Sequence, residues 1–143
     1  MRSRGWASLL GVVAALACAP AATAASETGH AASSCWTRAY GPNIAKNPLR
    51  VVSVGQFHCT YHTPARATVV LQGYYSHKWN KVAQVSKVLD MTAGHTYTER
   101  ASAVCQANPR STMRMRTYLY FRSFRTPVFV FAGPTLASRF FCV

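Results

Sequence analysis

Residues 112–123 alternate without interruption between side chains typical of a protein core and basic or aromatic side chains typical of a surface. One set of alternate positions is suited to a core: Met113, Met115, Thr117, Leu119 and Phe121. The other set is basic and aromatic: Arg114, Arg116, Tyr118, Tyr120 and Arg122. A period of two residues is that of a β-strand buried on one side, so the run predicts a strand with one face in the core and one in solvent.

The chain beyond residue 34 consists of short apolar runs separated by prolines and glycines. Residues 67–76 and the stretch around Cys59 alternate in the same way. Residues 81–89 and 98–108 also fit a helix in part, but we predict strands for both, because valines favour a strand in the first. Short apolar runs separated by prolines and glycines predict an all-β fold. We expect an immunoglobulin-like β-sandwich of about seven short antiparallel strands.

The first residues have the pattern of a secretory signal. Arg2 and Arg4 form a basic start, residues 9–17 an apolar stretch, and residues 22–24 (Ala-Thr-Ala) a cleavage site of the A-x-A type. We therefore expect residues 1–24 to be a signal peptide that is removed, and the mature protein to be secreted.

The mature chain is then predicted to have a flexible leader, 25–34, and one β-sandwich domain, 35–143. Lipid attachment at Cys18 is an alternative that would leave the protein anchored. It is less favoured because Ala15 stands where lipoprotein signals usually have a larger aliphatic residue. No later run has the ~20 apolar residues of a spanning helix, so no transmembrane segment is expected.

Four cysteines remain after such cleavage: Cys35, Cys59, Cys105 and Cys142. In an oxidising compartment we expect them to form two disulfides. Four cysteines allow three connectivities, and sequence does not choose among them. By analogy with the inter-sheet bridge and packed tryptophan of immunoglobulin domains, we expect Cys59 to pair with Cys105 against Trp79. Cys35 and Cys142 then join the two ends of the domain.

Several short motifs together carry a family resemblance. They are Val-Val-Leu-Gln at 69–72, Trp-Asn-Lys-Val-Ala at 79–83, Cys105 and the basic strand at 114–122. The combination resembles uncharacterised small secreted actinobacterial proteins with an immunoglobulin-like β-sandwich fold. The resemblance covers about residues 50 to 142 and implies a fold and an exported location, with no activity. The chain departs from true immunoglobulin domains at Ala103, where a tyrosine corner would place tyrosine.

Residues for catalysis are scarce. The chain has three acidic residues, Glu27, Asp90 and Glu99, whereas glycosidase chemistry needs two carboxylates flanking a bond. We interpret Asp90 and Glu99 as surface charges beside a turn. No G-x-S-x-G elbow presents a serine, and paired cysteines are not nucleophiles. We expect no enzyme activity, no catalytic residues and no cofactor.

A metal site is not expected either. His58 and His62 are the best-spaced histidines, four positions apart. On a strand this spacing puts them on one face about 13 Å apart, too far to share one ion.

Positive charge is the remaining functional signal. The chain carries 16 Lys and Arg against 3 acidic residues, a net charge of +13. Loss of Arg2 and Arg4 with the signal would leave +11 (13 − 2). Such a chain attracts polyanions whatever its fold.

The outward set of the alternating strand is the candidate anion-binding face: Arg114, Arg116, Tyr118, Tyr120 and Arg122. Guanidinium forks hold phosphate or carboxylate, and rings offer stacking surface. The expected partner is an anionic cell-wall polymer or polysaccharide, with no specific nucleic acid. The alternative is an ordinary solvent-facing strand, where arginine and tyrosine are common. Arg38, Arg50 and Arg66 are expected to lie elsewhere on the surface.

A second function from another class is a secreted inhibitor of an extracellular hydrolase. Small two-disulfide actinobacterial β-proteins include such inhibitors, although this chain lacks the Trp-Arg-Tyr triplet of the amylase inhibitors. An inhibitor would present a rigid exposed loop closed by a disulfide, whereas an anion-binding module would present a contiguous positive face.

Overall fold

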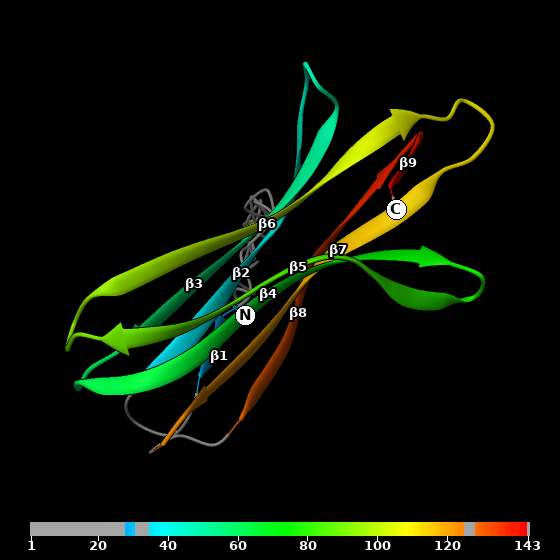
Figure 1. Cartoon of the computed structure of the whole chain (residues 1–143). Helices are drawn as coiled ribbons and strands as arrows, with labels where there is room; N and C mark the ends of the chain where they lie inside the picture. The colour runs from blue at the N-terminus through cyan, green and yellow to red at the C-terminus, as the bar shows by residue number, and fades with distance from the viewer. Residues whose placement is uncertain (1–27, 31–34, 125–127, 143) are drawn as a thin grey trace, which may run out of the picture.

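The computed structural model describes residues 28–30, 35–124 and 128–142, and Figure 1 shows them as long strands joined by turns. Nine strands are present in this part of the chain. They are β1 (Thr28–His30), β2 (Cys35–Ala45), β3 (Arg50–Cys59), β4 (Thr63–Tyr75), β5 (Lys78–Met91), β6 (Thr96–Ala107), β7 (Met113–Ser123), β8 (Phe129–Ser138) and β9 (Phe140–Cys142). The expected signal peptide, with Cys18, lies outside the described residues.

The strands form two antiparallel sheets. A five-stranded sheet has the order β1-β2-β3-β6-β9, and a four-stranded sheet has the order β5-β4-β7-β8. The chain crosses between the sheets after β3, β5, β6 and β8, which gives a sandwich in place of a simple meander. The prediction of an all-β, immunoglobulin-like β-sandwich is confirmed. The strand number exceeds the expected seven by two three-residue strands, β1 and β9.

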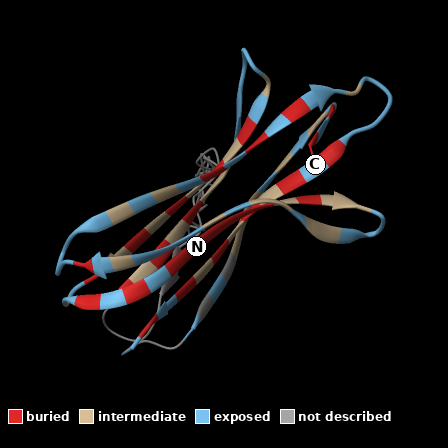
Figure 2. Ribbon diagram, viewed as in Figure 1, coloured by how far each residue is buried: buried red, intermediate tan, exposed pale blue. Residues whose placement is uncertain are grey.

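The core lies between the sheets and follows the alternation seen in the sequence. Figure 2 shows buried and more exposed positions alternating along several strands. On β7 all five residues predicted to face inward are buried. Phe121 from this strand stacks on Phe57 of β3, with ring centroids 5.6 Å apart. Burial of such rings is the main favourable term that holds the two sheets together.

One inward position of β7 is polar and is satisfied inside the core. The hydroxyl oxygen of Thr117 lies 2.6 Å from the Tyr40 carbonyl oxygen and 2.9 Å from the Ser53 hydroxyl oxygen. These contacts join β7 to β2 and β3 of the other sheet. Because this hydroxyl has hydrogen-bond partners, its burial does not have the free-energy cost of burying an unpaired polar group.

The two ambiguous segments are strands, as predicted. Residues 81–89 lie within β5, and residues 98–108 fall on β6 up to Ala107. Part of the segment predicted to be a flexible leader, 25–34, is a strand. Thr28–His30 forms β1 and pairs with β2, with Thr28 directly opposite Arg38. The sheet therefore begins before Cys35.

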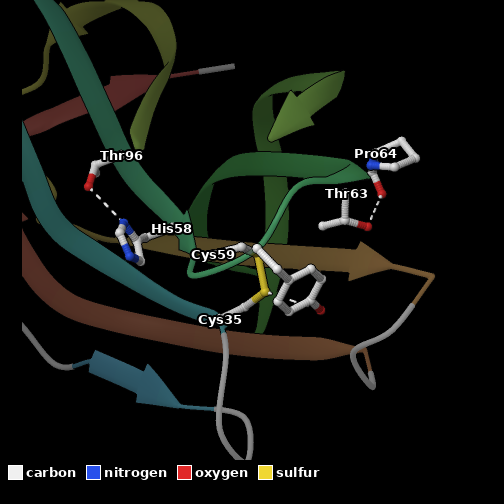
Figure 3. The surroundings of a disulfide bond; sticks show 7 residues. Cys35, His58, Cys59, Thr63, Pro64 and Thr96 are labelled. Atoms are coloured by element: carbon white, nitrogen blue, oxygen red, sulfur yellow. Dashed lines mark hydrogen bonds between the residues drawn. A yellow bond between two sulfur atoms is a disulfide. The ribbon is translucent and has the colours of Figure 1, made fainter. Parts of the chain in front are cut away.

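The predicted disulfide connectivity is wrong. Cys35 bonds to Cys59 and Cys105 bonds to Cys142. Each cystine joins residues that lie directly opposite on neighbouring strands, β2 with β3 and β6 with β9. The first is shown in Figure 3, near the hydrogen bond between His58 and Thr96.

The reason is the sheet assignment of the strands that carry Cys59 and Cys105. These strands, β3 and β6, are antiparallel neighbours in one sheet, so no inter-sheet bridge between them exists. The register pairs Arg50 with Val104, which places Cys105 at the opposite end of β3 from Cys59. Nine residues of extended strand separate the two ends by about 30 Å, far beyond disulfide reach.

Trp79 is also placed differently from the prediction. It is half-buried on β5 of the four-stranded sheet, where it pairs with Tyr74 of β4. It therefore packs on the outer surface of the sandwich and contacts neither cystine in the way an immunoglobulin tryptophan does.

Candidate anion-binding face

The outer face of the four-stranded sheet carries the five candidate residues on β7. Antiparallel pairing sets a second row from β4 beside them. The pairs are Arg66 with Arg122, Thr68 with Tyr120, Val70 with Tyr118, Gln72 with Arg116, and Tyr74 with Arg114. Side chains of directly opposite residues lie on the same face of a sheet. The face therefore combines the predicted residues with a neighbouring strand that the alternation of β7 alone did not reveal.

One end of this face is an arginine–aromatic ladder made of Tyr74, Trp79, Arg114 and Arg116. The guanidinium of Arg114 lies 4.2 Å from the ring centroid of Tyr74, and that of Arg116 lies 4.2 Å from that of Trp79. The two rings meet edge to face with centroids 5.3 Å apart. Stacking of cations on rings holds both guanidinium planes in fixed positions.

Arg116 is held further by a hydrogen bond. Its Nε donates to Oε1 of Gln72 at 2.8 Å. Part of its donor set is thus used within the protein. The two arginines of the ladder act first as packing groups, and only their remaining N–H groups are open to an anion.

The other end of the face is an arginine pair, Arg66 and Arg122. These residues are directly opposite across β4 and β7, and both are exposed. Like charges in directly opposite positions destabilise a sheet. A bound anion between them removes this repulsion, which gives the pair a physical reason to bind one.

The two acidic residues of the described chain are engaged elsewhere. Oδ1 of Asp90 lies 2.8 Å from Nε2 of His62, and Oε2 of Glu99 lies 2.8 Å from Nζ of Lys87. In the strand register, Asp90 is the closer of the two carboxylates to the arginine pair. It is directly opposite Pro64, which precedes Arg66 by two residues on β4 and lies on the same face of the sheet. Among the described residues, neither carboxylate forms an ion pair with Arg66 or Arg122.

The arginine pair borders a hollow in the surface. An open pocket of about 470 Å³ is lined in part by Arg66, Arg122, Tyr120 and Phe124. Its volume is sufficient for a phosphate group and part of the chain that carries it. The two guanidinium groups and the phenol of Tyr120 supply donors of the type that bind phosphate or carboxylate oxygens.

The prediction that Arg66 lies away from the candidate face is wrong. Arg38 and Arg50 do lie on the five-stranded sheet, on β2 and β3, but Arg66 is the direct neighbour of Arg122. The alternation of β4 was visible in the sequence, whereas its pairing with β7 was not. The pairing of β4 with β7 brings Arg66 and Tyr74 into the face, and the pairing of β5 with β4 brings in Trp79.

The histidines singled out for metal binding have separate partners. His58 stacks on Trp36 with centroids 5.1 Å apart, and its Nδ1 lies 3.2 Å from the Thr96 hydroxyl oxygen. His62 pairs with Asp90. Over the described ranges, no group of three or more His, Cys, Asp or Glu side chains is arranged to hold a metal ion. Nor does this part of the chain contain a helix long and apolar enough to cross a membrane.

Comparisons with known proteins identify no family for this chain. No protein-family model matches the chain, and no curated protein matches its sequence. Among solved structures it is similar to a crystal structure described as an ApaA protein from Bordetella pertussis, with 10% identity and a TM-score of 0.42. The alignment covers 72% of this chain and 90% of that one. A similarity at this level carries no argument about activity, ligand or partner.

Proposed function

We propose that this protein is an exported module that binds anionic polymers of the cell envelope through the outer face of its four-stranded sheet. The observation that carries the proposal is the arginine pair, Arg66 opposite Arg122, with the two described carboxylates engaged by His62 and Lys87. Two disulfides are typical of proteins that work outside the cytoplasm, which supports an exported location.

The face suits an extended ligand better than a small one. Arg114 and Arg122 are eight residues apart on one strand, a span of about 26 Å at ~3.3 Å per residue. Tyr118 and Tyr120 lie between them on the same outward side. An anionic polymer laid along β7 meets the arginine pair at one end and the remaining donors of the ladder at the other. Repeated charges along the polymer then bind several positions at once.

The test is the replacement of both members of the arginine pair, Arg66→Gln with Arg122→Gln. Binding of soluble polyphosphate, measured by titration at several salt concentrations, is expected to weaken about tenfold and to depend less steeply on salt. The matched control is Arg50→Gln with Arg100→Gln, which removes the same charge from exposed positions of the five-stranded sheet. The control is expected to lose less than about threefold. Equal losses in the two variants would mean that net charge alone attracts the polymer.

Inhibition of an extracellular hydrolase remains the alternative function. The β2–β3 turn, residues 46–49, projects from the sandwich in Figure 1 and provides an exposed loop. The Cys35–Cys59 cystine, however, lies at the far end of this hairpin, so it does not close the loop at its base. Stoichiometric inhibition of a secreted protease or amylase, lost on changes in this turn, would favour the alternative over anion binding.

A further inference from the structure

Exposed apolar side chains gather around the arginine pair. Seven large hydrophobic residues are exposed in the described chain, and four of them lie at this end of the four-stranded sheet. They are Phe124 (88% exposed), Val88 (71%), Val130 (56%) and Val128 (47%). Single exposed apolar residues are ordinary on a protein surface, but a cluster marks a place where another surface binds.

Strand register, the pocket lining and position along the chain place these four residues near the arginine pair. Val88 on β5 is directly opposite Arg66, and Val130 on β8 is directly opposite Tyr120. Phe124 follows Arg122 by two residues and lines the same pocket. Val128 precedes Val130 by two residues. We call Val88, Phe124, Val128 and Val130 the apolar rim.

We propose that the apolar rim and the arginine pair together dock the protein on an anionic phospholipid surface. This inference goes beyond binding of a soluble polymer, because a hydrated polyanion leaves the rim exposed to water. A bilayer surface meets both needs at once. Its phosphates lie at the level of the guanidinium groups, and the region just below accepts apolar side chains.

The positive charge beside the apolar rim favours an anionic lipid surface over an uncharged one. Arg66 and Arg122 border the rim directly, and Asp90, the acidic residue nearest in register, is paired with His62. An uncharged lipid surface offers nothing to the two arginines, and an acidic headgroup does. Basic residues alone or apolar residues alone bind membranes weakly, so the combination in one patch is what gives stable attachment.

The experiment uses the whole mature chain and vesicles of two compositions. One set contains phosphatidylglycerol mixed with phosphatidylcholine, and the other contains phosphatidylcholine alone. We expect co-sedimentation with the mixed vesicles and little with the neutral ones. Val130→Ser, at a rim position outside the pocket lining, is expected to lower partitioning onto the mixed vesicles about fivefold, with polyphosphate binding and melting temperature unchanged. Val104→Ser, which removes an exposed valine from β6 on the other sheet, is the control and is expected to have no effect.

The arginine-pair variant completes the design. Arg66→Gln with Arg122→Gln is expected to weaken binding both to mixed vesicles and to polyphosphate. Equal binding to neutral and mixed vesicles, or unchanged vesicle binding by Val130→Ser, would overturn the lipid proposal. If polyphosphate binds while mixed vesicles do not, the lipid inference fails and the polymer function stands. Vesicle binding that depends on Val130 and on the arginine pair, without polyphosphate binding, would sustain the inference and reject the polymer function.

Discussion

Replacing Phe121 by alanine is expected to destabilise the fold by about 3–5 kcal/mol, a large share of the stability of a domain of this size. Phe121 is fully buried and stacks on Phe57 across the space between the sheets. Its removal loses the transfer free energy of the ring and leaves a cavity that the strands on either side cannot close. Denaturant unfolding followed by tryptophan fluorescence measures the loss.

The control for this change is Tyr118→Ala on the same strand. Tyr118 points outward and is half-buried, so its replacement is expected to cost only about 1 kcal/mol. Both variants remove an aromatic ring from β7 and alter strand propensity alike. Similar losses in the two would mean that β7 does not present Phe121 to the core.

Removal of the Cys105–Cys142 cystine by alanine at both positions is expected to cost about 3–4 kcal/mol. This bridge closes a loop with a sequence separation of 37 residues, and its loss frees the unfolded chain to adopt more conformations. The same change at Cys35 and Cys59, where the separation is 24, is expected to cost slightly less. Thermal unfolding of the two double variants beside the wild type measures both effects.

Peptide mapping of the unreduced protein provides the corresponding check on connectivity. We expect proteolytic fragments that link Cys35 with Cys59 and Cys105 with Cys142. Fragments that link Cys59 with Cys105 would contradict the register of β3 and β6. A double variant that melts at the wild-type temperature would contradict the stabilising role of its cystine.

Local periodicity in the sequence was enough to predict the strands. The alternation of residues 112–123 marked β7, its inward residues and its outward residues, because side-chain direction in a strand depends only on the parity of position. The valines of 81–89 marked β5 for the same local reason. The all-β sandwich follows from several such strands, since each has an apolar side to bury.

Pairing between strands was not predictable in this way. Whether β6 lies beside β3 or across the core depends on the whole topology, and this choice determined which partner Cys105 has. The candidate face depended on the same kind of information. Arg122 was found from its own strand, whereas Arg66 joined it only through the pairing of β4 with β7. When a site is formed by residues of two paired strands, the sequence therefore shows the residues of each strand but not that they lie together.

The placement of both cystines within the five-stranded sheet has a mechanical consequence. A force pulling the domain between Cys35 and Cys142 passes through the sulfur–sulfur bonds and bypasses the loops that they close. Residues 36–58 and 106–141 then bear no tension, so only the chain between Cys59 and Cys105 can be drawn out. Strand β7, with Arg114 and Arg122, lies within a shielded loop, whereas β4, with Arg66, lies in the extensible part. Tension on a tethered molecule would therefore separate Arg66 from Arg122. The outward residues of β7 would stay together inside the loop that the Cys105–Cys142 cystine closes.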